Sequence, residues 1–114
     1  MAYDQALEER INEMWVREFP EEHALITVKK MFGGLVYLYQ GKMTVGIVGD
    51  LLMARVISPE FENVLEEVEV RPMDFTGRPL KEFIYVEPEG FRTYEQLIRW
   101  ARFGLQHARK QLSK

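Results

Sequence analysis

The sequence predicts one α+β domain over residues 1–114, in the order α-β(3)-α-β(2)-α. It is expected to form two layers, an antiparallel five-stranded sheet with its helices packed on one face. Apolar residues recur at helical spacing near both ends of the chain. Between them lie short runs rich in β-branched and aromatic residues, separated by Gly and Pro. The 114 residues, 46% hydrophobic and 29% charged, have the composition of an ordinary globular domain.

The first helix is predicted over residues 4–18. Its apolar side chains recur at i, i+4, i+7 and i+8, and they are Leu7, Ile11, Met14 and Trp15. Asp4 is expected to cap the helix, because its carboxylate can accept hydrogen bonds from the free N–H groups of the first turn. Pro20 sets the other end, since the residue before a proline is pushed out of the α region.

Three strands are predicted next, over Lys29–Gln40, Met43–Val48 and Leu51–Ile57. Tight turns at Gly41-Lys42 and Gly49-Asp50 separate them. Gly33-Gly34 interrupts the first strand, and a glycine pair inside a strand is typical of a bulge or of a close approach between backbones. A phosphate-binding loop is disfavoured, because more strand residues follow the pair instead of a helix.

A short helix is predicted to begin at Ser58-Pro59-Glu60, which combines a capping serine, a proline at the first helical position and an acid in the first turn. Two further strands follow, over Val70–Phe75 and Glu82–Glu87. Pro72 restricts the first of these to an edge of the sheet or to a bulge, because proline has no N–H to donate.

The last helix is predicted to begin at Thr93, with Gln96 completing a capping box. One face of this helix carries Leu97, Trp100, Ala101, Gly104 and Ala108. The small residues on that face indicate close packing against the sheet, so Trp100 is expected to be buried there.

No catalytic, cofactor or metal site is expected, and the chain is predicted not to be an enzyme. It has no cysteine, and its two histidines, His23 and His107, lack companions at metal-ligand spacing. We expect His23 in an exposed loop and His107 on the outer side of the last helix. Ser58 and Ser113 do not stand in a nucleophile elbow, which disfavours a serine hydrolase.

The charge is unevenly distributed along the chain. Residues 1–22 hold seven acidic and two basic side chains, whereas residues 92–114 hold six basic and one acidic, with a net charge of −3 overall. This asymmetry indicates either a partner surface or, as we favour, mutual neutralisation and a favourable helix dipole. The absence of cysteine fits a cytoplasmic location. No signal peptide is apparent, and no run approaches the roughly 20 apolar residues of a membrane helix.

Two sets of residues, in order, resemble the pattern of the TfoX N-terminal domain family, the front half of the TfoX/Sxy regulators of bacterial natural competence. The first set is Met31-Phe32-Gly33-Gly34, Tyr37, Gly41-Lys42-Met43, Gly46, Leu52-Met53 and Arg55. The second set is Arg71-Pro72-Met73-Asp74-Phe75-Thr76-Gly77-Arg78-Pro79, Tyr85-Val86 and Trp100-Ala101. The resemblance implies the same order of helices and strands. It brings no catalytic residues, and the competence regulators carry a second, helical domain that it does not cover.

The motif residues define a candidate interaction surface, made of Met31, Phe32, Gly33, Gly34, Arg55, Asp74, Gly77 and Arg78. For the three charged residues, an ion pair or a turn hydrogen bond is favoured over ligand binding. Gly77 is expected to supply a positive φ in its turn.

The leading interpretation is a non-enzymatic, TfoX-like protein-interaction module, linked to regulation of competence or transcription. Its partner is another protein or a second copy in a homodimer. Six methionines favour an adaptable surface, although core filling is the alternative for the four in strands. The alternative function is nucleic-acid binding by the basic last helix. We consider it unfavourable, because Arg99, Arg102 and Arg109 on one ridge reach few phosphates.

Overall fold

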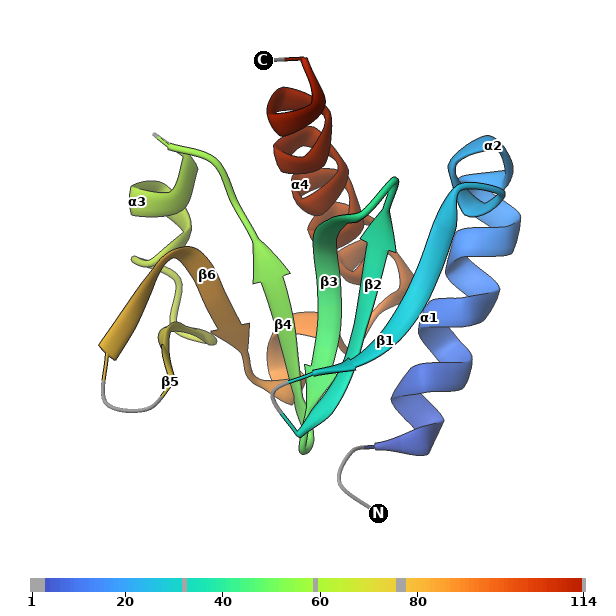
Figure 1. Cartoon of the computed structure of the whole chain (residues 1–114). Coiled ribbons are helices and arrows are strands. Elements are labelled where there is room, and N and C mark those ends of the chain that lie inside the picture. Colours follow the sequence, from blue (N-terminus) through green and yellow to red (C-terminus); the bar gives the residue numbers. More distant parts are fainter. Residues whose placement is uncertain (1–3, 32, 59, 76–77, 114) are drawn as a thin grey trace.

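The computed structural model describes residues 4–31, 33–58, 60–75 and 78–113, with residues 74, 75 and 78–81 described by their backbone (Figure 1). The helices are α1 (Gln5–Glu18), α2 (Pro20–His23), α3 (Glu60–Val64) and α4 (Tyr94–Leu112), with a 3-10 turn η1 (Pro88–Phe91) before α4. The strands are β1 (Ile26–Met31), β2 (Gly34–Tyr39), β3 (Lys42–Val48), β4 (Leu51–Arg55), β5 (Val70–Phe75) and β6 (Arg78–Val86). The fold is α+β, as predicted.

The sheet has six antiparallel strands in the order β1-β2-β3-β4-β6-β5, one more than predicted. The single strand expected over Lys29–Gln40 is wrong, because β1 and β2 form a hairpin there. Gly33 has a φ of +76°, which lets the chain reverse. At Gly34 the close approach is confirmed, since a Cβ would lie 1.8 Å from the carbonyl oxygen of Ile47.

The observed register shift lies elsewhere, between Tyr37 and Leu38, where β2 pairs with β3. Thr44 is the extra residue opposite this step, and it is fully buried. Its hydroxyl donates a hydrogen bond of 2.8 Å to the carbonyl oxygen of Tyr37. The hydroxyl therefore satisfies the carbonyl oxygen of Tyr37 at the point where the hydrogen bonding between β2 and β3 is irregular.

Helices α1 and α4 cover one face of the sheet, as expected. The predicted apolar stripe of α1 is buried. Trp100 is 1% exposed, and its indole N–H donates to the carbonyl oxygen of Gly90 at 2.9 Å. A Cβ on Gly104 would lie 2.7 Å from the backbone of Thr44, so the α4 and β3 backbones touch directly. The caps at Asp4 and Thr93 are also confirmed.

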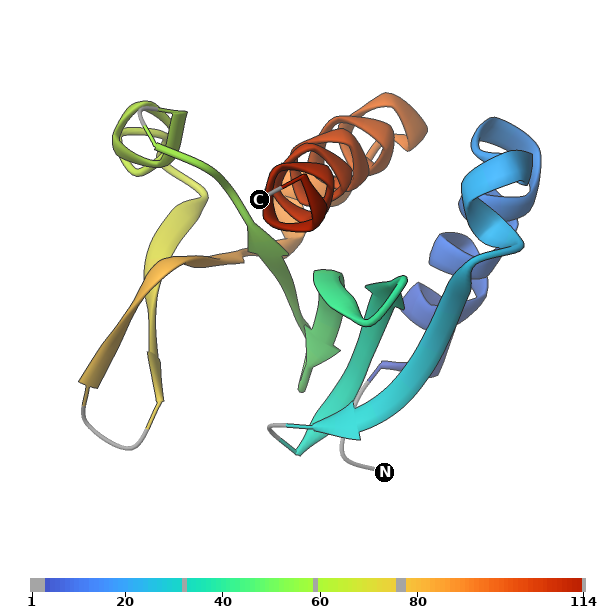
Figure 2. The same ribbon diagram turned by 45° about the horizontal axis from the view of Figure 1, so that its top comes forward.

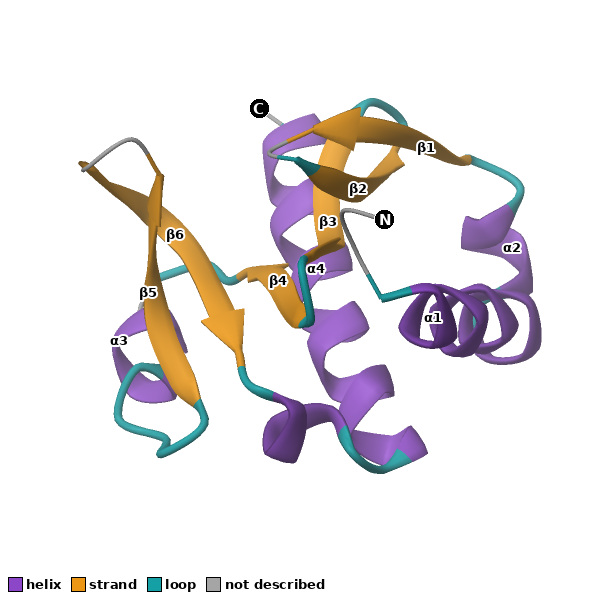
Figure 3. Cartoon of the chain, turned by 90° about the horizontal axis from the view of Figure 1, so that it is seen from below, coloured by secondary structure: helices purple, strands orange, loops and turns teal. Residues whose placement is uncertain are grey.

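None of the helices in the described part of the chain covers the other face of the sheet, and the sheet bends around that face. Figures 2 and 3 show the β1–β3 half and the β5–β6 hairpin diverging from β4 toward this side. Strand register and packing place these side chains on it: Lys29, Met31, Val36, Leu38, Met43, Val48, Met53, Arg55, Arg71, Met73, Phe83 and Tyr85. We call this set the open face.

Two further expectations concern the region from α3 to β5. Pro72 lies on the edge strand β5, as predicted. The helix α3 has only five residues, so packing and not propensity must hold it. Pro59 was expected at the first helical position, and it lies outside the described residues. None of the described helices is long and apolar enough to cross a membrane.

Candidate functional site

The predicted interaction surface falls into separate parts of the sheet. Met31, Gly33 and Gly34 form the connection between β1 and β2. Asp74 and Arg78 lie on the two strands of the β5–β6 hairpin, next to its turn. Because β1 and β5 are the two outer strands, Met31 and Asp74 belong to opposite edges of the sheet. Phe32 and Gly77 lie outside the described residues, so the expected positive φ of Gly77 stays a prediction.

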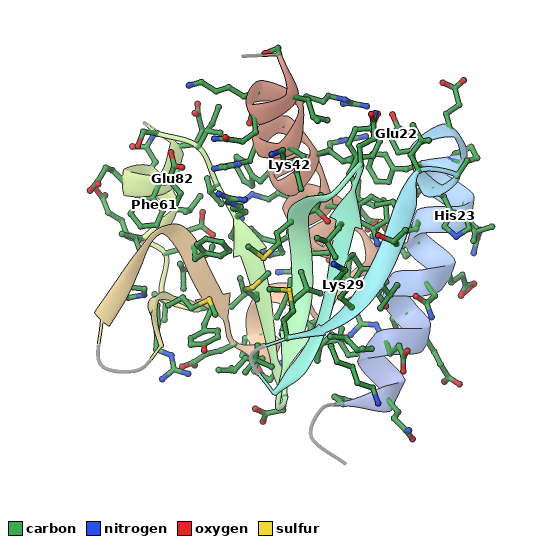
Figure 4. All side chains as sticks on the ribbon, in the orientation of Figure 1. Glu22, His23, Lys29, Lys42, Phe61 and Glu82 are labelled. Carbon is green, nitrogen blue, oxygen red and sulfur yellow. The ribbon has the colours of Figure 1, made fainter. Side chains whose placement is uncertain are left out.

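The open face is apolar and rich in methionine. At its centre Met53 and Met73 are fully buried, together with Val36, so these side chains fill the angle of the bent sheet. Around them Met31 and Met43 are only half-buried. Figure 4 shows the sulfur atoms gathered on this side of the sheet. The face is thus a small second core with an accessible, adaptable rim.

The charged members of the open face are the cations Lys29, Arg55 and Arg71, and the carboxylate of Glu87 pairs with the last of them. Lys29 is exposed on β1, directly opposite Val36. The guanidinium of Arg55 stands over the ring of Phe83, 4.8 Å from its centroid, which is the geometry of a cation–π contact. Arg71 lies 3.1 Å from a carboxylate oxygen of Glu87, so its charge is partly neutralised.

A buried polar cluster joins α4 to β4 and β6. His107 was expected on the outer side of α4, and this is wrong, because the side chain is 1% exposed. Its Nε2 lies 2.8 Å from an Oε1 of Glu82. The position follows from the helical period, since residue 107 comes three residues after Gly104 and seven after Trp100, on the stripe that faces the sheet. That spacing could have predicted the burial.

Glu82 is held in an uncommon backbone conformation. Its φ is +70°, although it is not a glycine. Its carbonyl oxygen accepts from the Val56 N–H at 2.8 Å, and its carboxylate accepts from the Ser58 N–H at 3.4 Å. These contacts hold the middle of β6 against the segment that follows β4. No sequence pattern marks this residue.

The protonation states in this cluster follow from burial and pairing. Burial lowers the pKa of His107, although the hydrogen bond to Glu82 works against that. The buried Nδ1 of His107 has no hydrogen-bond partner among the described residues. A neutral ring that carries its proton on Nε2 and donates it to Glu82 leaves no proton on Nδ1, so this form fits the site. Burial by itself would raise the pKa of Glu82. The hydrogen bond from His107 and its charge lower the pKa, and Ser58 and Arg55 add smaller contributions in the same direction. Together they outweigh burial, so the pKa of Glu82 is lowered.

The basic last helix uses most of its arginines internally. Arg99 forms a two-pronged ion pair with Glu67, and Arg109 pairs with Glu22. Among the described residues, no hydrogen bond or ion pair engages Arg102. The three arginines do share one side of α4, as the spacing predicted.

No group of three or more Asp, Glu or His side chains in the described part of the chain could hold a metal ion. The imidazole of His107 and the carboxylate of Glu82 form a closed pair in which the imidazole is covered. This arrangement stabilises a junction of three elements. The open face is therefore the stronger candidate for recognition.

A family model supports the resemblance noted from the motifs. The TfoX N-terminal domain model matches residues 19–108, from the end of α1 to the last turns of α4. Comparisons with curated proteins and with solved structures found no match. The match covers well over half of the chain and includes every strand of the sheet. The chain belongs to the TfoX N-terminal domain family.

Proposed function

We propose that this chain is a non-enzymatic protein-interaction module that binds an acidic, amphipathic segment of a partner protein on its open face. One observation carries the proposal: an apolar, methionine-rich sheet face that none of the described helices covers and that carries the cations Lys29 and Arg55. Regulation of competence or transcription is the wider role that family membership supports.

The rim of the open face has the chemistry of an adaptable binding surface. Met31 and Met43 are half-buried, and unbranched methionine side chains can change rotamer to fit a partner. Tyr85 lies with them on the same face. The two fully buried methionines, Met53 and Met73, fill the core instead, so the alternative interpretation applies to them.

Charge selects the kind of partner. Lys29 lies on the edge strand β1 and Arg55 on the central strand β4, beside the apolar residues of the open face. A partner segment with apolar side chains on one side and carboxylates at its margins would complement both features. A second copy of the chain would bring the same cations together, which disfavours a symmetric dimer through this face.

Nucleic-acid binding is the alternative, and the geometry of α4 weakens it. Arg99 and Arg109 would have to give up their pairing with Glu67 and Glu22 before they could reach a phosphate. Of the three arginines of α4, Arg102 alone has no hydrogen bond or ion pair among the described residues. Each phosphate contact adds to affinity through counterion release, so one free arginine supports little binding at physiological salt.

Site-specific photo-crosslinking in living cells tests the proposal. A photoreactive residue is placed at position 43 on the open face and, as a matched control, at position 16, where Val16 is 53% exposed on α1. We expect a defined crosslinked protein from position 43 and none from position 16. Mass spectrometry of the crosslinked peptide should identify an acidic, amphipathic segment.

Three outcomes of this experiment would contradict the proposal. Equal crosslinking from both positions would show no preference for the open face. A crosslink to a peptide of this same chain would identify a homodimer instead. No crosslink from position 43 would leave the face without a partner.

A further inference from the structure

A hollow of about 570 Å³ opens beside α4, on the side of the molecule away from the open face. Residues of α4 and the end of α1 line it, and they are Phe19, Glu95, Arg99, Arg102, Phe103, Leu105, Gln106 and Arg109. Its volume falls within the range typical of sites for small molecules. The open-face proposal does not use it.

The hollow has an apolar part. Leu105 is 1% exposed, and Phe19 and Phe103 are half-buried beside it. Phe19 belongs to the end of α1, so the wall includes a residue far from α4 in the chain. An apolar ligand body would remove these side chains from water.

The cationic part is held in place before any ligand arrives. Arg99 is fixed by Glu67 and by the Trp100 and Phe103 rings, whose centroids lie 4.5 and 5.4 Å from its guanidinium. The hydrogen bond with Glu67 raises the pKa of Arg99.

On the other side, Arg109 is fixed by Glu22 and stands 5.9 Å from the ring centroid of Tyr39. Figure 4 shows Glu22 between α2 and α4. Arg102 lies between these two arginines in sequence and has no hydrogen bond or ion pair among the described residues.

The electrostatics favour a small negative charge over a large one. The single acid of the lining, Glu95, opposes a polyanion. Most of the lining residues lie in the interior of α4, where the helix uses its own backbone N–H groups. The lining residue from the first turn of α4 is the acid Glu95, which disfavours a phosphate there. A carboxylate suits the unengaged Arg102, because a guanidinium can bind it with two parallel hydrogen bonds.

We propose that this hollow binds a small amphipathic monocarboxylate, with its carboxylate on Arg102 and its apolar body against Phe19, Phe103 and Leu105. The two paired arginines, Arg99 and Arg109, frame the hollow and do not have to rearrange. The proposal is independent of the partner proposed for the open face, because the two sites share no residue.

Decanoate, used below its micellar concentration, is the probe, and a ¹H–¹⁵N NMR titration of the full chain is the measurement. We expect saturable shifts at the amides of Phe19 and of α4 and at the side-chain Nε–H of Arg102. Decyltrimethylammonium, with the same chain and the opposite charge, should produce none. Arg102→Gln should weaken decanoate binding about tenfold, the size expected for one charge-assisted contact.

Lys110→Gln is the matched control, since Lys110 is an exposed cation of the same helix outside the lining. It should change the affinity less than about twofold, because the charge it removes contacts no ligand atom. Equal weakening by both variants, an equal response to the cationic probe, or shifts confined to β2–β4 would overturn the proposal. The proposal would also be overturned if a hexaglutamate peptide bound in the hollow and decanoate did not. The hollow would then bind an acidic protein segment instead of a small carboxylate.

Discussion

The two faces of the sheet differ in how they are held. On the covered face, large aromatic side chains from three elements interlock, with Trp15 and Tyr37 6.4 Å apart between ring centroids and Trp100 anchored to Gly90. On the open face, methionines fill the bend of the sheet, and none of the described helices packs over them. The side chains of the covered face are therefore held in fixed packing positions, whereas the methionines of the open face can change rotamer.

This difference indicates a division of roles within one small domain. Substitutions on the covered face should cost stability. Substitutions at the rim of the open face should cost recognition and leave stability nearly unchanged. The predictions below test that contrast, in order of the size of the expected effect.

Trp100→Ala should have the largest effect. The variant removes a fully buried aromatic side chain and leaves the carbonyl oxygen of Gly90 without its indole donor. Loss of a buried tryptophan typically costs about 3–5 kcal/mol, a large part of a domain's stability. Urea denaturation followed by circular dichroism measures the loss. A midpoint close to that of the natural chain would show that α4 does not pack as described.

Gly104→Ala should destabilise the chain by about 1–3 kcal/mol, the cost of overpacking a tight contact. Alanine would ordinarily stabilise a helix interior relative to glycine, by about 1 kcal/mol. Here its Cβ would lie 2.7 Å from the backbone of Thr44, so the sign should reverse. Gln106→Ala, at an exposed position of the same helix, is the control and should stay within about 0.5 kcal/mol. A stabilised Gly104→Ala variant would contradict the direct contact of α4 with β3.

The His107–Glu82 pair should give the covered face a pH dependence. Because burial lowers the pKa of His107 in the folded state, the unfolded chain takes up the proton at a higher pH than the folded chain. The stability is thus fully present above the usual histidine pKa of about 6.5 and is lost as the pH falls below it.

Denaturant midpoints measured between about pH 7.5 and 5.5 cover this window. His107→Gln should flatten the pH dependence, because glutamine cannot take up the proton. His23→Gln should leave it unchanged, since His23 is exposed. Equal slopes for the natural chain and His107→Gln would refute the linkage. Glu82 adds a loss of the same sign at lower pH, because its folded pKa is also lowered.

Met53→Leu should have a smaller effect on stability than Trp100→Ala. Met53 is fully buried at the centre of the open face, but leucine has a similar volume and the neighbouring methionines can rearrange. We expect a loss below about 1.5 kcal/mol in the same denaturation assay. A loss as large as that of Trp100→Ala would show that both faces are equally rigid.

The sequence predicts what depends on local physics. Capping at Asp4 and Thr93 and the burial of Trp100 follow from side-chain chemistry and helical spacing. Pro72 could be assigned to an edge because it cannot donate to a ladder. In contrast, the hairpin at Gly33 was not predicted. The positive φ of Gly33 makes the chain reverse direction there, and a glycine pair in the sequence is equally compatible with a bulge inside one strand.

The candidate site depends more on tertiary structure, and less of it could be predicted. Met31 and Arg55 were identified, but the bend that places them on one open face results from the pairing of β4 with β6. The polar junction at Glu82 was invisible, because it joins residues 25 positions apart. The ion pairs that fix Arg99 and Arg109 likewise connect distant segments.

The most direct test of the division of roles is a charge reversal measured in two assays. Lys29→Glu is introduced into the chain that carries the photoreactive residue at position 43, with Lys110→Glu as the control. We predict that Lys29→Glu abolishes the crosslink while the denaturation midpoint stays within about 0.5 kcal/mol of the parent, because Lys29 is exposed. Lys110→Glu should leave both unchanged. A crosslink that survives Lys29→Glu, or one lost equally in both variants, would contradict recognition by the open face.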